Sequence, residues 1–169
     1  MNKDQRTVAI GAASGIVGMI VLVSVLSMAL PKPEGMETLA ERLAFALQWN
    51  VLAALPLFIM FITVANSRFL SEAIDPLAQR ETVAQITNGR VLDNTLQQNF
   101  VFLVATLALA TVLEEKLQVI AATAIVFVLA RFVFWYGYRK HPLLRAPGMS
   151  ATAYLNLGLM GFVIYRAFF

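Results

Sequence analysis

Five apolar segments run through this chain, and each is about as long as a helix that crosses a lipid bilayer. Crossing the hydrocarbon core takes about 20 helical residues. The segments are Val8–Leu30, Leu43–Asn66, Arg90–Leu113, Leu117–Tyr138 and Ser150–Phe169. Only 14% of the residues are charged, whereas a soluble domain has about a quarter. The sequence therefore predicts an all-α integral membrane bundle with five transmembrane helices.

The remaining polar residues exclude several classes of function. The chain has no cysteine, which rules out disulfides, thiolate metal sites and a cysteine nucleophile. Its single histidine, His141, has no second histidine with which to form a metal pair, so we expect no metal site. The net charge of +3 is too small for the basic face that nucleic acid requires, so we expect no nucleic-acid partner.

The first apolar segment, Val8–Leu30, follows a short basic start with Lys3 and Arg6, a pattern that signal peptides share with membrane spans. It is longer than the apolar part of a signal peptide, and no clear cleavage site follows it, so we interpret it as a span. Its glycines recur at helical spacing. They either let a second helix approach closely or reflect the frequency of glycine in membrane helices. These glycines are Gly11, Gly15 and Gly18.

A single arginine, Arg131, lies inside the fourth span. An unpaired guanidinium in a membrane costs at least a few kcal/mol, so Arg131 needs a partner. The short turn at residues 114–116 makes the third and fourth spans antiparallel neighbours. The polar start of the third span then lies at the depth of Arg131. We therefore expect the partner to be among Asp93, Asn94 and Gln97.

Two stripes of side chains meet at this end of the bundle. The stripes are Arg90, Asn94 and Gln97, spaced i, i+4, i+7, and Arg131, Phe134 and Tyr138, spaced i, i+3, i+7. Each set shares one face of its helix, and Arg145 follows in a basic loop. Guanidinium groups bind carboxylates through paired hydrogen bonds, which predicts an anionic ligand here. The alternative is a polar network that only fixes the register of the helices.

The basic residues indicate how the chain crosses the membrane, because lysine and arginine concentrate in cytoplasmic loops. Five spans would put the N-terminus, residues 67–89 and residues 139–149 on one side. That side holds Lys3, Arg6, Arg68, Arg80, Arg90, Arg139, Lys140 and Arg145, and the other holds Lys32, Arg42, Lys116 and Arg166. We therefore expect a cytoplasmic N-terminus and a polar site that opens to the cytoplasm.

The two stripes resemble the signatures of a known family. The segment RVLDNTLQ at residues 90–97 is similar to the RxxxNxxE motif of the MAPEG family, the membrane-associated proteins of eicosanoid and glutathione metabolism. The segment ARFVFWYGY at residues 130–138, followed by Arg145, resembles that family's ARxxYxxGY…R motif. The resemblance covers residues 43–169. It predicts a MAPEG-like four-helix membrane domain there, preceded by an extra transmembrane helix and a connector at residues 1–42.

The resemblance implies a glutathione transferase-like membrane enzyme that conjugates or reduces lipophilic electrophiles. It implies a homotrimer, with glutathione as co-substrate bound between neighbouring subunits near the cytoplasmic side, and a lipophilic substrate that comes from the membrane. It assigns glutathione contacts to Arg90, Asn94, Gln97, Arg131, Phe134 and Tyr138. It makes Arg145 the catalytic residue, which lowers the pKa of the glutathione thiol and stabilises the thiolate.

Two positions depart from the family motifs. The family's glutamate is Gln97, which lacks the charge that would receive the amino group of glutathione or an arginine, and its tyrosine is Phe134, which lacks the hydroxyl. Both changes weaken a glutathione site, and neither affects Arg145. They leave open a non-catalytic MAPEG-like membrane protein that binds lipid or serves as a scaffold. A transporter is less favoured, because the spans show no obvious internal repeat.

Overall fold

Long helices joined by short connections make up the structure, a computed structural model that describes residues 1–169 except for the side chain of Pro76. The α-helices are α1 (Lys3–Ala29), α2 (Leu39–Phe69), α3 (Val83–Val112), α4 (Gln118–Lys140) and α5 (Ala146–Phe168). Short 3-10 turns are η1 (Glu72–Ile74), η2 (Pro76–Ala78) and η3 (Pro142–Arg145). The described residues contain no strand, so the predicted all-α class is confirmed.

Capping residues, rather than hydropathy, decide where α2 and α3 begin. α3 begins at Val83 instead of Arg90, because Thr82 and Gln85 form a capping box in which Thr82 Oγ1 accepts from the Gln85 backbone N–H at 3.3 Å. α2 begins at Leu39 for the same reason, with Thr38 as its cap. The last helix also begins earlier than the predicted span Ser150–Phe169. α5 begins at Ala146, and the Ser150 hydroxyl donates to the Ala146 carbonyl oxygen at 2.8 Å inside the helix.

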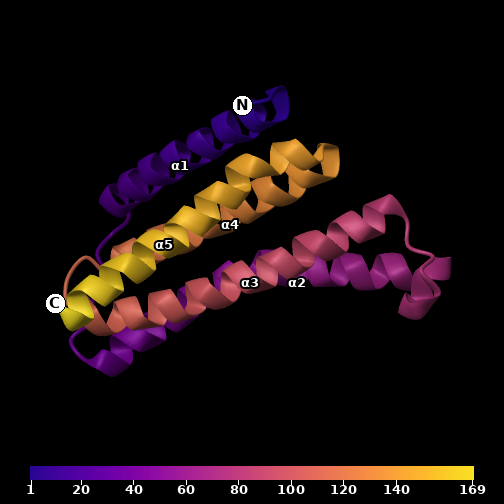
Figure 1. Cartoon of the computed structure of the whole chain (residues 1–169). Helices are drawn as coiled ribbons and strands as arrows, with labels where there is room; N and C mark the ends of the chain where they lie inside the picture. The colour runs from indigo at the N-terminus through magenta and orange to yellow at the C-terminus, as the bar shows by residue number, and fades with distance from the viewer.

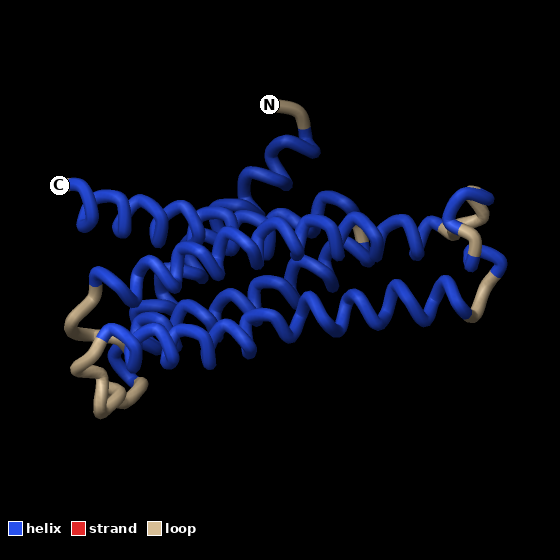
Figure 2. Tube along the Cα trace, turned by 90° about the horizontal axis from the view of Figure 1, so that it is seen from below, coloured by secondary structure: helices blue, strands red, loops and turns tan.

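The helices form two pairs with α1 laid over one of them. In Figure 1, α2 and α3 lie side by side, α4 and α5 form the neighbouring pair, and α1 covers α4 and α5 on the side away from α2. Most loops gather at the two ends of the bundle, as Figure 2 shows. The N-terminus lies at the same end as the α2–α3 and α4–α5 connections. The antiparallel pairing of the third and fourth spans is therefore confirmed.

The apolar core sits where α2, α3, α4 and α5 meet. The rings of Phe102 and Phe127 stack at its centre, with their centroids 4.5 Å apart. Buried alanines, including Ala46 and Ala53 on α2, surround them. Such small residues let helices approach closely, which compensates for the lack of a hydrophobic driving force between helices in lipid.

Four helices, α1 to α4, are long and apolar enough to cross a membrane. The expected fifth span falls in α5, which has 23 residues and is not one of these four. α5 packs along α4, and that it crosses the membrane beside α4 stays a prediction. The chain is an integral membrane protein with at least these four candidate spans.

α1 contacts α5 through backbone rather than through large side chains. A Cβ at Gly15 would collide with the carbonyl oxygen of Pro147, and a Cβ at Gly11 would lie 3.2 Å from Ala146 Cβ. The Ser150 hydroxyl donates to the carbonyl oxygen of Ala12 on α1 at 3.0 Å. The close-approach interpretation of the glycines is thus confirmed for Gly11 and Gly15. It does not hold for Gly18, around which there is open space.

Candidate functional site

Arg131 lies inside the bundle, with no part of it exposed. Its Nη2 donates to Asn94 Oδ1 at 3.0 Å, and its Nη1 donates to Thr152 Oγ1 at 2.9 Å. Its Nε has no hydrogen-bond partner among the described residues. Of the three expected partners, Asn94 contacts Arg131, whereas Asp93 and Gln97 are exposed. A positive charge is therefore held in the core by neutral acceptors alone.

A column of two aromatic rings between two arginines leads from Arg131 to the surface. The Arg131 guanidinium carbon lies 4.1 Å from the centroid of the Phe134 ring. The Phe134 and Tyr138 centroids are 5.8 Å apart, and the Arg145 guanidinium carbon lies 4.8 Å from the Tyr138 centroid. Exposure rises along this column, from buried Arg131 and Phe134, through half-buried Tyr138, to exposed Arg145. Cation–π attraction between each arginine and its ring supports this order.

Close backbone contacts fix the turn that carries Arg145. η3 follows α4 directly, and the Leu144 N–H donates to the carbonyl oxygen of His141 at 2.9 Å. A Cβ at Gly137 would collide with the Leu144 carbonyl group, and a Cβ at Gly148 would collide with the backbone of Phe134. Because glycine alone allows backbones to come this near, these two glycines determine where Arg145 leaves the end of α4.

The predicted stripe on α3 divides between the bundle and its outside. Asn94 is half-buried and contacts Arg131, whereas Arg90, Asp93 and Gln97 are exposed. Among the described residues, no hydrogen bond or ion pair joins Arg90 or Gln97 to Arg145. The single chain therefore links Arg131, Phe134, Tyr138, Arg145 and Asn94 through contacts, and Arg90 and Gln97 form no hydrogen bond or ion pair with them among the described residues.

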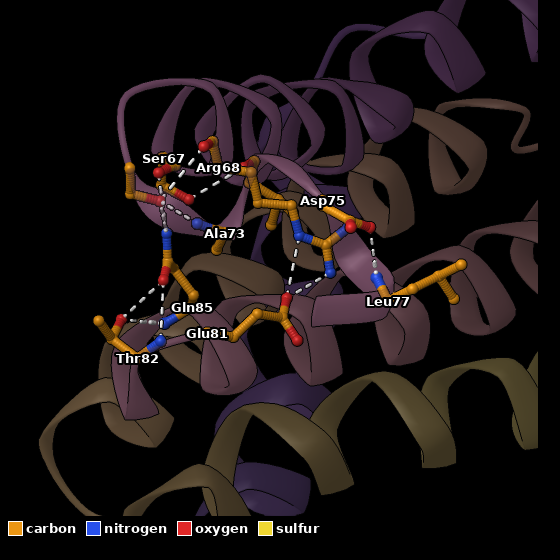
Figure 3. Close-up of polar contacts among 10 residues, drawn as sticks. Ser67, Arg68, Ala73, Asp75, Leu77, Glu81, Thr82 and Gln85 are labelled. Atoms are coloured by element: carbon orange, nitrogen blue, oxygen red, sulfur yellow. Dashed lines mark hydrogen bonds and ion pairs between the residues drawn. The ribbon is translucent and has the colours of Figure 1, made fainter. Parts of the chain in front are cut away.

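The corner between α2 and α3 is an ordered polar cluster, shown in Figure 3. Arg68 Nε donates to Glu81 Oε1 at 3.0 Å, so the Arg68 charge is paired within the chain. Gln85 Nε2 donates to the Ser67 carbonyl oxygen at 2.8 Å and to the Ser71 hydroxyl at 2.9 Å. These bonds hold the end of α2 against the start of α3 and thereby set the position of the polar stripe.

Two polar contacts near the site were not expected from the sequence. Thr152 accepts a hydrogen bond from Arg131, and Trp135 Nε1 donates to Asn88 Oδ1 at 3.0 Å, which joins α4 to α3. Thr152 lies within an apolar segment and belongs to no motif, so only the packing of α5 on α4 reveals it. Asn88 lies in the stretch that the sequence predicted to be a loop.

Two exposed guanidinium groups of the predicted site, those of Arg90 and Arg145, are suited to hold an anionic ligand. Both keep their donors free of ion pairs within the described chain. A guanidinium presents several N–H groups in a rigid fork that matches carboxylates. The Arg145 fork is in addition supported by the Tyr138 ring. The arrangement can therefore bind a carboxylate or stabilise an anion near the membrane boundary.

These features define a class, the helical integral membrane proteins that carry an arginine-bearing site at one end of the bundle. The sequence model of the MAPEG family matches residues 46–165, well over half of the chain. The chain therefore belongs to the MAPEG family, the membrane proteins of eicosanoid and glutathione metabolism. No curated protein and no solved structure gave a significant match. The matched range leaves α1 outside, and the division at residues 42 and 43 stays a prediction.

Proposed function

We propose that this protein is a glutathione transferase-like membrane enzyme that joins glutathione to lipophilic electrophiles at the Arg145 end of the bundle. Its family supports glutathione or eicosanoid chemistry in a membrane. The observation that carries the specific proposal is the exposed Arg145 guanidinium, which is held 4.8 Å from the Tyr138 ring centroid. A positioned guanidinium of this kind is suited to stabilising a thiolate.

The chemistry requires a thiolate at neutral pH. A free thiol has a pKa of about 8.5, so most of it is protonated, and a guanidinium beside the sulfur lowers this pKa. The thiol proton passes to water. The sulfur then forms a bond to the electrophilic carbon, and the leaving group departs with its electron pair. The electrophile arrives from the bilayer, because the site lies at the end of helices that are apolar enough to cross it.

We extend this proposal to a homotrimer with its sites between subunits and facing the cytoplasm. The exposed stripe on α3 supports it, because polar side chains on a membrane helix normally face protein or a water-filled cavity. One subunit would then contribute Arg90 and Gln97, which form no hydrogen bond or ion pair with Arg145 within the described chain. Its neighbour would contribute Tyr138 and Arg145.

Arg131 and Phe134 enter this proposal with a different role from the other predicted contacts. Both are buried, Phe134 with 2% of it exposed and Arg131 with none. In the proposed site they support Tyr138 from beneath, and glutathione lies on Tyr138 and Arg145.

The test is Arg145→Ala, assayed for glutathione binding by titration calorimetry and for turnover with a panel of lipophilic electrophiles. We expect turnover to fall by at least about 100-fold, the usual effect of removing one group that stabilises a developing anion. The melting temperature should not change, because Arg145 is exposed. Arg139→Ala is the matched control, since it removes another exposed arginine from the same end of the bundle. Full turnover in Arg145→Ala would refute the assignment.

A second candidate, a non-catalytic lipid-binding or scaffold protein, is favoured by one observation. The position of the family's motif tyrosine is the buried Phe134, which offers a ligand no hydroxyl and almost no accessible surface. With Gln97 neutral as well, two of the expected polar contacts of glutathione are lost. Absence of saturable binding at millimolar glutathione, together with a co-purified lipid, would select this candidate over the enzyme.

A further inference from the structure

A groove with a volume of about 510 Å³ lies on the outer face of α4. The residues that line it, which we call the α4 outer groove, are Phe132, Trp135, Tyr136, Arg139 and Lys140. Their spacing of i, i+3, i+4, i+7 and i+8 makes one stripe along the last turns of the helix. Tyr136 is two positions from Tyr138, which places it nearly opposite on the helix, at about 100° per residue. The groove is therefore separate from the Arg145 site.

Two cations border this groove. The Arg139 guanidinium carbon lies 5.8 Å from the Trp135 ring centroid, and Lys140 Nζ lies 5.6 Å from the Tyr136 centroid. Both cations are exposed, and neither forms a salt bridge with any residue that the structure describes. Cation–π attraction holds each head group above a ring. The groove thus combines an apolar wall with two positive charges that the chain does not neutralise.

The groove also lies at a suitable depth for a lipid. Arg139 and Lys140 occupy the last turn of α4, and Phe132 lies about 12 Å deeper by helical rise. Trp135 and Tyr136 come between them, and tryptophan and tyrosine concentrate at the level of the lipid headgroups. Along the groove, charge therefore gives way to aromatic and then to apolar surface, in the same order as along a phospholipid molecule.

We propose that the α4 outer groove binds one anionic phospholipid, with its phosphate between Arg139 and Lys140 and an acyl chain along Phe132 and Tyr136. A guanidinium pairs two of its N–H groups with phosphate oxygens, and an ammonium adds a point charge. A zwitterionic lipid binds less well, because its own cationic group is repelled by the same two side chains. This inference does not depend on the proposed glutathione chemistry.

The first test measures lipid retention by native mass spectrometry of the full chain, released from nanodiscs of equal phosphatidylglycerol and phosphatidylcholine. We expect preferential retention of phosphatidylglycerol. Arg139→Gln/Lys140→Gln should reduce this retention by about tenfold or more, since one basic group near an anionic surface contributes roughly a factor of five. Lys3→Gln/Arg6→Gln is the control, because it removes the same charge from the same end of the bundle. Equal losses in both variants, or none in the first, would overturn the proposal.

The second test locates the lipid through Trp135. The chain has two tryptophans, so Trp49→Phe leaves Trp135 as the only indole. Phosphatidylglycerol with brominated acyl chains should quench Trp135 more than brominated phosphatidylcholine at the same mole fraction, and Arg139→Gln/Lys140→Gln should remove the difference. Equal quenching by both lipids would refute a specific site. Restoration of the fluorescence by soluble glycerol phosphate would instead identify a site for free phosphates and overturn the lipid as its occupant.

Discussion

Arg131 and Arg145 stand at opposite ends of one arginine–aromatic column, and their surroundings differ sharply. Arg131 is fully buried, with its terminal nitrogens bonded to Asn94 and Thr152, whereas Arg145 is exposed beside Tyr138. The buried arginine has its terminal donors engaged in joining three helices, while the exposed one keeps its donors for a ligand. Two arginines of one motif thus have separate tasks, one in the fold and one in the chemistry that we propose.

The largest effect on stability should come from Arg131→Ala, which opens a cavity among α3, α4 and α5. We expect the free energy of unfolding in detergent to fall by about 3 kcal/mol or more, as for other large buried side chains. Arg131→Met should recover most of this loss, because it refills the volume without a buried charge. Denaturation of the wild type and of both variants measures the free energy of unfolding. Normal stability with abolished glutathione binding would show that Arg131 is a ligand contact after all.

Gly148→Ala tests the backbone contact that connects the two regions. The new Cβ would collide with the backbone of α4 at Phe134 and Ala130, so we expect a loss of about 1–3 kcal/mol, typical of overpacking. Gly158→Ala is the matched control on the same helix, because it has open space around it. It should be neutral or stabilising by up to about 1 kcal/mol from helix propensity. Equal melting temperatures of the two variants would contradict the close packing of α5 on α4.

Variants of Tyr138 test whether its ring or its hydroxyl matters at the exposed end of the column. If the ring positions Arg145, then Tyr138→Leu should weaken glutathione binding by roughly fivefold, equivalent to a cation–π contact of about 1 kcal/mol. Tyr138→Phe keeps the ring and should bind nearly as the wild type does. Calorimetry measures both dissociation constants. Equal weakening in the two variants would mean that the hydroxyl contacts the ligand, as the family resemblance implies.

The smallest effect should come from Arg68→Gln at the α2–α3 corner. Arg68 pairs with Glu81, but 38% of the Arg68 side chain is exposed, and pairs at the surface contribute about 1 kcal/mol or less. The loss should shrink further in high salt, which screens exposed charges. Arg80→Gln is the control, because its nearest acidic oxygen, on Glu72, is 3.8 Å away and both side chains are largely exposed. If Arg68→Gln lowered the free energy of unfolding more than Arg131→Ala does, the buried arginine would not be the more important of the two for stability.

Much of the architecture could be predicted from the sequence, because it rests on local patterns. Apolar runs predict membrane helices, and the short turn at residues 114–116 makes α3 and α4 neighbours. Asn94 could be named as a candidate partner of Arg131 for that reason. The start of α3 was missed, because the hydropathy of residues 83–89 is low, while the Thr82 cap that begins the helix is a hydrogen-bond pattern.

Taken alone, the sequence determined the all-α membrane class, the family and the presence of two arginines in one motif. Hydropathy, helical period and motif spacing are local properties, and they can be determined without knowledge of how the helices pack. The tertiary structure alone decided which groups hold the buried Arg131 in place. That depends on α5, where Gly148 lets the helix approach Phe134 and Thr152 then reaches Arg131. Contacts between segments far apart in the chain are needed to identify the acceptors of a buried guanidinium.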